Sequence, residues 1–592
     1  MHFRTRYAQA VLFALLVIGV HTGFAKGDLK IDHTVSLSDP STQQFHITTN
    51  ISNIDQDRLD LSLPTWTPGW STVENYGKNL LRFRITDASG KTLPLMMSRK
   101  QTWNVKTRGV RQIHIDYDYR ATVLALNQAK INEDFAFFTG IELFLQPEGH
   151  RDAPSTVHFR IPPGWKIATA LKDTSDPMTF TAVDYDTLVD APVEMGKFDV
   201  TRFEVEGKPH YFIANPAGTF SKEKSDKFVG MLTKVAKAQS AIFGGLPYDK
   251  YVYFYFFAPP ESNASGALEH MNSFVAFAPA GSVATPEMIL GTASHEFFHV
   301  WNVKRIRPAE MWPYDYSREN ETPLLWFSEG FTNYYGALAV YRAGLMTADD
   351  FLQRVADTAS GIEGSEARSY ISPANSSVST WVGYDTPVAF GISYYSQGQN
   401  IAALLDLSIR HDTDGKAGLD DVMRALFNEN YKRGRGFTTE DMIRVVNRLS
   451  GKDYHDFYQR FVFGTDVPDY DTIFGYAGYK VQKVVQKAPI FGFNGRFRSG
   501  GLAVNSVDPK SPASAAGLQV GDVIVRVDGT PAQQVSLFSL TGKTINLDIE
   551  RGGTAVKLPM TVGSRDNTGY NLAAISAASP KQIKIREGWL KR

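Results

Sequence analysis

The chain has 592 residues, of which 43% are hydrophobic and 21% charged, as expected for a folded protein of several domains. Its 62 basic and 62 acidic residues cancel, so the net charge gives no sign of a nucleic-acid partner or an anionic membrane surface. There is no cysteine, which excludes disulfides, thiolate metal ligands and a lipidated lipoprotein terminus.

The N-terminus has the pattern of a secretion signal. Arg4 and Arg6 precede an apolar run from Ala10 to Val20, and Gly23-Phe24-Ala25 then offers a small-x-small cleavage pattern. The apolar run is short for a bilayer span, which needs about 20 residues. We expect the mature protein to begin near Lys26, to have no stable membrane span after signal removal, and to be periplasmic or secreted in a bacterium; an uncleaved anchor is the alternative.

The next part of the chain alternates polar and apolar residues in short runs. Leu29 to Val35 is one such run, and Asp87-Ala88-Ser89-Gly90 is typical of a turn between strands. This pattern predicts an N-terminal all-β sandwich, with Trp66 and Trp70 as core residues rather than cleft residues. Further strands at Tyr251 to Phe257 and Ser273 to Ala280 lead into a mostly helical region.

The segment His295-Glu296-Phe297-Phe298-His299 carries the strongest chemical signal. Residues four apart lie on one face of an α-helix, so His295 and His299 can each offer a ring nitrogen to one metal ion. From its position on that helix, the Glu296 carboxylate can take a proton from a water that attacks a carbonyl. The spacing predicts a metallopeptidase active site.

Residues around this motif mark the extent of its helix and a later loop. Thr285 as N-cap and Pro286 in the first turn predict the start, and Lys304, Arg305 and Pro308 predict the end. A stretch rich in Gly, Ser and Pro at residues 361–391 predicts a long loop beside the cleft.

Glu329 is the candidate third metal ligand. It lies in the apolar segment from Leu325 to Tyr335, where an acidic side chain is costly unless it is paired or bound to metal. Three protein ligands with one position left to water are typical of a catalytic zinc site. We therefore expect one Zn²⁺ per chain, held by His295, His299 and Glu329; such a site also accepts cobalt or manganese.

These residues resemble the gluzincin metallopeptidases, which pair H-E-x-x-H with a glutamate on a following helix. Gly266-Ala267-Leu268-Glu269-His270 resembles their G-x-M-E-N exopeptidase motif, and Tyr395-Ser396-Gln397-Gly398 their Y-x-K-G motif. The resemblance implies that Glu269 binds the α-amine of the substrate, with Gly266 and Ala267 beside it. It also implies that the Tyr395 hydroxyl stabilises the oxyanion.

The similarity is greatest to the glycyl aminopeptidase family, bacterial gluzincins with a PDZ domain after the catalytic region. It covers nearly the whole mature chain and is carried by residues 63–70, 191–198, 295–308, 325–335 and 420–426. It implies a thermolysin-like, mostly helical catalytic domain and a preference for N-terminal glycine or alanine. The sequence departs from the wider motifs at two positions, with Gln397 in place of Lys and His270 in place of Asn. These departures leave the substrate preference of the pocket undetermined.

The C-terminal part resembles a PDZ domain. Ser511 to Leu518 predicts a short helix, Gly521 to Val527 a turn and a strand, and Asp528-Gly529 a hairpin. PDZ domains bind a peptide C-terminus by adding a strand to a sheet edge, and Gly501 to Val504 is the candidate carboxylate loop. A packing or autoregulatory module without a peptide ligand is the alternative.

The sequence therefore predicts a multidomain α+β protein. The expected parts are a signal peptide (1–25), a β domain (26–205), a zinc peptidase domain (206–480), a PDZ domain (481–566) and a tail with a short helix (567–592). The expected function is a secreted zinc aminopeptidase acting on peptides with a free N-terminus. The alternatives are a zinc endopeptidase and a non-catalytic PDZ-based peptide-binding protein.

Overall fold

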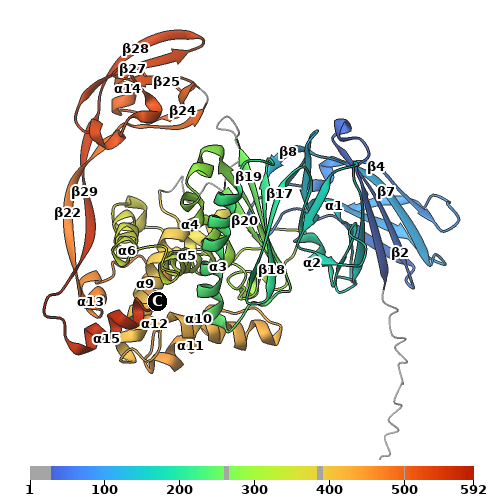
Figure 1. Cartoon of the computed structure of the whole chain (residues 1–592), viewed down its shortest axis with the longest axis horizontal. Coiled ribbons are helices and arrows are strands. Elements are labelled where there is room, and N and C mark those ends of the chain that lie inside the picture. Colours follow the sequence, from blue (N-terminus) through green and yellow to red (C-terminus); the bar gives the residue numbers. More distant parts are fainter. Residues whose placement is uncertain (1–28, 259–265, 383–390, 499) are drawn as a thin grey trace, which may run out of the picture.

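The computed structural model describes residues 29–258, 266–382, 391–498 and 500–592. The expected secretion signal lies outside these residues. No helix in the described ranges is long and apolar enough to cross a membrane. Figure 1 shows a β domain, a central mixed sheet covered by helices, and a small β module that projects from the helical side.

The N-terminal domain is a β-sandwich, as predicted. Its strands form sheets of seven, four and five strands in the orders β14-β15-β12-β1-β2-β7-β4, β11-β3-β6-β5 and β13-β16-β10-β9-β8. Alternate residues of these strands point inward, and Phe45, Ile47 and Ile115 are among those that are fully buried in the core between the sheets.

The strand bounds of this domain are β1 Lys30–Ser36, β2 Gln44–Ser52, β3 Arg58–Ser62, β4 Leu80–Asp87, β5 Leu95–Arg99, β6 Thr102–Lys106, β7 Gln112–Arg120, β8 Thr122–Ala125, β9 Gln128–Ile131, β10 Phe135–Thr139, β11 Gln146–Pro147, β12 Ser155–Arg160, β13 Lys166–Thr169, β14 Lys172–Asp173, β15 Thr179–Ala182 and β16 Pro192–Gly196. Two short helices, α1 (Gly140–Leu143) and α2 (Tyr185–Val189), lie between strands.

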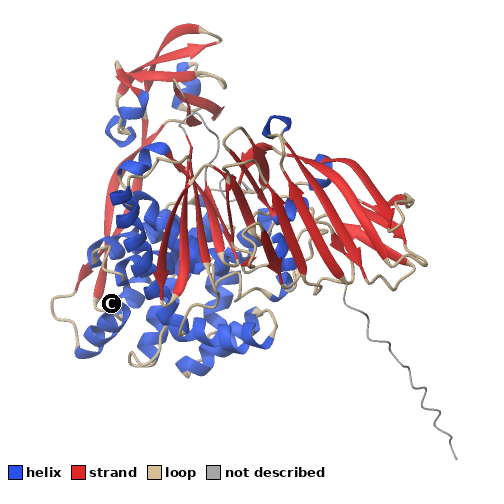
Figure 2. Ribbon diagram, turned by 45° about the vertical axis from the view of Figure 1, so that its right-hand side comes forward, coloured by secondary structure: helices blue, strands red, loops and turns tan. Residues whose placement is uncertain are grey.

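A central five-stranded sheet joins the β domain to the helices (Figure 2). Its order is β17 (Asp199–Val205), β18 (Lys208–Asn215), β19 (Tyr251–Ala258), β21 (Ser273–Pro279) and β20 (Gly266–His270). Along β19, Tyr253 and Tyr255 face the helical core, whereas Val252 and Phe254 pack with residues of the β domain. Both faces of the sheet are therefore buried, which explains why β19 is apolar throughout.

The helical region follows this sheet. Its helices are α3 (Lys222–Phe243), α4 (Glu287–Phe298), α5 (Thr332–Arg342), α6 (Ala348–Glu363), α7 (Pro373–Val378), α9 (Tyr394–Asp412), α10 (Leu419–Glu429), α11 (Thr439–Ser450), α12 (His455–Tyr458) and α13 (Tyr470–Gly475).

Two expectations about this region need correction. Helix α4 ends at Phe298 and not near Arg305, because the chain tightens: the Val300 amide donates to the Phe297 carbonyl, and the His299 ring bonds the Asn302 carbonyl. The expected loop at 361–391 is helical in part, since α6 extends to Glu363 and α7 begins after the Ser372 cap. Residues 383–390 lie outside the described part.

The PDZ module is inserted between two paired strands. Strands β22 (Tyr479–Ile490) and β29 (Gly563–Ala574) form a long antiparallel ribbon that carries the module, seen at its far end in Figure 1. The module contains β23 (Phe493–Arg498), β24 (Gly501–Val507), α14 (Pro512–Ala516), β25 (Val523–Val527), β26 (Thr530–Pro531), β27 (Thr544–Arg551) and β28 (Thr554–Thr561). The helix, strand and hairpin predicted after Ser511 are present.

The prediction that Gly501 to Val504 form a carboxylate-binding loop is wrong. These residues begin strand β24, which pairs with β23 on one side and β25 on the other, so their backbone groups serve the sheet. Strand β24 is therefore not an edge strand, because β23 pairs with the side of it that β25 leaves free.

The chain does not end in a free tail. Helix α15 (Pro580–Trp589) returns to the catalytic core, where Trp589 is fully buried and its indole Nε1 donates to the Tyr334 hydroxyl over 2.7 Å. The expected domain boundaries also fall inside paired elements: residue 205 within the β17–β18 hairpin, and residues 480 and 566 within the ribbon. Strand pairing across these positions makes them parts of continuous units.

Candidate active site

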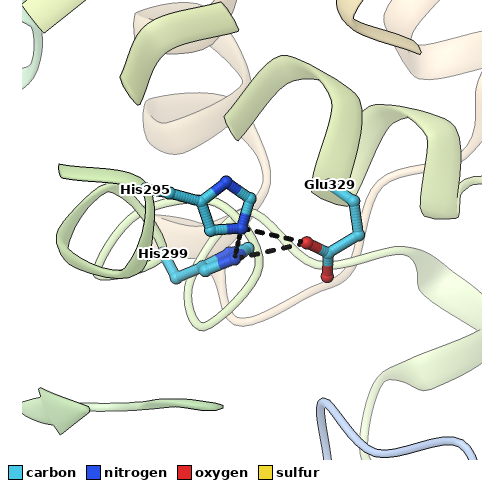
Figure 3. Close-up of side chains that lie close together, drawn as sticks. All are labelled: His295, His299 and Glu329. Atoms are coloured by element: carbon cyan, nitrogen blue, oxygen red, sulfur yellow. Dashed lines mark hydrogen bonds and ion pairs between the residues drawn. The ribbon is translucent and has the colours of Figure 1, made fainter. Parts of the chain in front are cut away.

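The two histidines and Glu329 meet at one point (Figure 3). The Nε2 atoms of His295 and His299 lie 3.0 Å apart, and each lies 3.4 Å from Oε2 of Glu329. Ligands held at about 2.0–2.1 Å from a tetrahedral zinc lie about 3.3 Å from one another. The three donor atoms thus have the separation that one zinc ion requires.

Local structure brings the third ligand to this point. Glu329 lies in a π-helical turn, Trp326–Phe331, at the start of α5. Helix α9 packs against this turn at Gly398, where an added Cβ would lie 1.8 Å from the Trp326 carbonyl oxygen. The glycine of the Tyr395-to-Gly398 segment therefore allows the close approach that places Tyr395 and Glu329 on neighbouring elements.

Asn302 links the two ligand-bearing segments. Its carbonyl accepts from Nδ1 of His299 over 2.5 Å, which leaves Nε2 of that ring for the metal. Its side-chain Nδ2 donates to the Phe327 and Ser328 carbonyls at 3.0 and 3.1 Å. Sequence reasoning missed Asn302; its position three residues after His299, in an irregular turn, gives no pattern that would mark it.

The site contains an excess of buried carboxylates. Glu269, Glu296 and Glu329 are all buried, and atoms of the first two lie within 4.8 Å of the His299 ring nitrogen and of each other. Burial by itself would lower the pKa of His299, but the Glu329 and Glu269 carboxylates raise it to about 9. Burial raises the pKa of Glu296 to about 8. A divalent cation would offset this negative charge, so the residues fit a metal ion.

Glu269 lies on β20, the edge strand of the central sheet, and faces α4 as expected. Its Oε1 is buried and has no hydrogen-bond partner among the described residues. Gly266 and Ala267 lie on the same strand, at its start. Glu269 therefore offers a carboxylate oxygen next to the metal ligands.

Tyr395 borders the same cleft as the metal site. It stands at the start of α9, and its ring centroid lies 6.1 Å from that of His295. The cleft has a volume of 1490 Å³ and is lined by His295, Glu296 and Tyr395 and by residues of α6. This is enough space for a peptide beside the metal ligands.

Neither of the two residues that depart from the wider motifs lines this cleft. The Gln397 side chain is buried and donates to the Ile371 carbonyl over 3.0 Å. His270 is buried at the end of β20, with Nδ1 3.4 Å from Oδ1 of Asp190. Trp66 is a core residue, as predicted, and packs against Tyr314 and Trp381.

Comparison with protein families agrees with these features. The family model for the peptidase M61 N-terminal domain matches residues 32–197, the model for M61 glycyl aminopeptidase matches residues 288–401, and a PDZ model matches residues 503–537. The chain belongs to the M61 glycyl aminopeptidase family. The matched catalytic segment of this M61 member contains both histidines, Glu296, Glu329 and Tyr395.

The M61 member is similar over its length to the crystal structure of an aminopeptidase N family protein from Idiomarina loihiensis. The two share 26% identity with a TM-score of 0.80, covering 95% of this chain and 100% of that one. Shorter similarities are to the regulator of sigma-E protease RseP of Escherichia coli K12 and to a probable periplasmic serine endoprotease DegP-like protein of Ectopseudomonas mendocina. The first is 37% identical over 87 residues, which is 14% of this chain, and the second 35% over 107 residues, which is 17%. The chain spans only about a fifth of the length of these curated relatives, 19% and 22% respectively.

Proposed function

We propose that this protein is a zinc aminopeptidase that removes the N-terminal residue of peptides. The observation that carries the proposal is Oε1 of Glu269, a buried carboxylate oxygen that has no hydrogen-bond partner in the described structure and lies next to the three-ligand site. The Lys304 ammonium lies 3.9 Å from this oxygen, beyond hydrogen-bond distance. A substrate ammonium would pair with this oxygen. In an endopeptidase, which binds no substrate ammonium at this place, Glu269 would serve only the structure.

The metal-binding residues and Glu296 have separate roles in the proposed reaction. His295, His299 and Glu329 would hold one zinc ion, which when bound supplies a Lewis acid that polarises the scissile carbonyl and acidifies water. Glu296 takes the proton of the attacking water and passes it to the leaving amine.

Substrate binding completes the mechanism. Glu269 holds the α-ammonium, and the exposed edge of β20 at Gly266 and Ala267 can pair with the extended substrate backbone. The Tyr395 hydroxyl donates a hydrogen bond to the oxyanion that forms during attack. Family membership favours glycine or alanine as the residue removed. We place the enzyme in the bacterial periplasm or outside the cell, with the PDZ module as a peptide-binding module.

The test is hydrolysis of Gly-Ala-Phe by the zinc-loaded protein, by Glu296→Gln and by a matched control, Glu440→Gln, which changes an exposed glutamate on α11. We expect Glu296→Gln to lose at least about a hundredfold in kcat while retaining one zinc per chain, and the control to match the wild type. A zinc-loaded wild type that leaves the peptide intact would overturn the proposal and direct attention to peptide binding by the PDZ module.

A further inference from the structure

A row of charged side chains, buried at Glu269 and Lys304 and half-buried at Asp190, extends from the candidate site into the N-terminal domain. The Lys304 ammonium lies 2.9 Å from Oδ1 of Asp190 and 3.9 Å from Oε1 of Glu269, and the Lys304 side chain is 1% exposed. Asp190 ends helix α2 of the β domain, whereas Lys304 follows the zinc-ligand helix α4. The row therefore crosses the interface between the two domains.

Asp190 is held in place from several sides. It accepts a hydrogen bond from the Met271 amide over 2.5 Å and lies 3.4 Å from Nδ1 of His270. Arg305 donates to the Met271 carbonyl over 3.1 Å, so the hairpin that carries Glu269 is tied to the segment after α4 as well. The position of Asp190 relative to Glu269 is thus fixed by hydrogen bonds within a single turn.

Both members of the Asp190–Lys304 pair are charged. Burial acts to lower the pKa of Lys304, but the attraction of Asp190 and Glu269 outweighs it and the pKa is raised. Burial acts to raise the pKa of Asp190, yet Lys304 lowers it well below its usual range. A buried ammonium between two carboxylates is neutralised by the one that it contacts, and the 2.9 Å contact is with Asp190.

We propose that Asp190 is a positioning residue, which holds the Lys304 ammonium away from Glu269 so that Oε1 of Glu269 stays available to the ammonium of the substrate. The inference rests on the proposed function of Glu269. Without the Asp190 charge, Lys304 would turn to Glu269, and an internal ion pair would compete with the substrate. With Asp190 in this role, the N-terminal β domain contributes to substrate affinity through a residue that does not contact the substrate.

The test compares Asp190→Asn with the double variant Asp190→Asn/Lys304→Met, all loaded with zinc. We expect Asp190→Asn to reduce kcat/KM for Gly-Ala-Phe at least about tenfold, mainly through KM. The reason is that Lys304 would pair with Glu269, the charged hydrogen-bonding partner of the substrate ammonium. The double variant has no competing cation and should return to within about threefold of the wild type. Affinity for Gly-Ala-Phe, measured by calorimetry in a Glu296→Gln background, should follow the same order.

A purely structural role for the pair predicts the opposite order, with the double variant as impaired as the single one or more so, and that result would overturn the inference. So would an Asp190→Asn variant that binds the peptide as tightly as the wild type. If Asp190→Asn does not fold, as judged by its melting temperature, the double variant decides: near-normal affinity supports the inference and weak affinity contradicts it. Failure of the proposed function is separate, because the wild type would then show no peptide hydrolysis.

Discussion

The backbone of Gly69 lies against the carboxylate of Glu269. An added Cβ at Gly69 would stand 2.7 Å from Oε2 and 2.9 Å from Oε1, and the residue has φ of +91°. Gly69 belongs to a loop of the β domain whose Thr65 amide donates to the Tyr316 carbonyl over 2.8 Å, which anchors the loop to the catalytic region. The β domain therefore forms one wall of the proposed amine site.

Substitution of Gly69 by alanine tests this contact. The methyl group would displace the Glu269 carboxylate, and we expect kcat/KM for Gly-Ala-Phe to fall by about tenfold or more, as for other small displacements in an active site. The matched control is Gly90→Ala, which has a similar φ of +85° but no atom within 4 Å of the added Cβ. Equal activity losses in the two variants would attribute the effect to backbone strain. They would contradict the claim that Gly69 shapes the position of the Glu269 carboxylate.

The C-terminal helix should stabilise the catalytic domain. Trp589 is fully buried and donates to Tyr334 on α5, the helix that follows Glu329. We expect Trp589→Ala to cost about 3–5 kcal/mol of the free energy of unfolding, measured by urea denaturation of the zinc-loaded protein. Ile583→Ala, on the same helix but 37% exposed, should cost far less; similar losses in both variants would show that the indole has no special role.

The effect of removing the PDZ module on stability and activity should depend on which residues are deleted. Ile490 and Gly563 face each other across the ribbon, so residues 491–562 can be replaced by Asn-Gly while the ribbon and α15 remain. We expect this variant to keep the wild-type melting temperature of the catalytic domain and its hydrolysis of Gly-Ala-Phe. Truncation after residue 478 also removes α15 and should prevent stable folding; a soluble, active truncated protein would contradict the role of the helix.

Buried Glu194 on β16 predicts a pH dependence of stability. Burial raises its pKa from 4.5 to about 8. Between these values the unfolded chain gives up the proton and the folded protein retains it, so stability is fully present below pH 4.5 and falls as pH rises toward 8. Its Oε1 accepts from Nδ2 of Asn215 over 2.7 Å, a bond that glutamine can keep.

We therefore expect Glu194→Gln to match the wild type near pH 4.5 and to become more stable than it by roughly 1 kcal/mol for each pH unit up to 8. Melting temperatures at pH 5 and 7.5 measure the difference, with the exposed Glu204→Gln as the control. A constant difference across this range would mean that Glu194 is ionised in the folded protein.

The parts of the site that the sequence predicts are those encoded by local spacing. His295, Glu296 and His299 are fixed relative to one another by one helix, and Glu329 is recognisable because a carboxylate in an apolar segment needs a partner. The β-sandwich and the short elements of the PDZ module follow from strand alternation and turn residues, which are also local signals.

The parts that it could not predict depend on contacts between distant segments. Gly69 lies against Glu269, and Asp190 pairs with Lys304, in both cases across a domain interface. No pattern along the chain connects these residues. Lys304 resembles a cation at a helix end, yet it is buried. The capping box at Ser579 predicts helix α15 but not where it packs, since the bond from Trp589 to Tyr334 joins residues far apart in the chain.

Recognition of the free amine of a peptide by Glu269 is what distinguishes the proposed aminopeptidase from an endopeptidase. The most direct measurement is the ratio of kcat/KM for Gly-Ala-Phe to that for N-acetyl-Gly-Ala-Phe, in the zinc-loaded wild type and in Glu269→Gln. We predict a ratio above about a hundred in the wild type and a large fall in the variant, caused by loss of activity on the free peptide only. Equal cleavage of the two peptides by the wild type would show that Glu269 does not recognise the amine and would assign the zinc site to an endopeptidase.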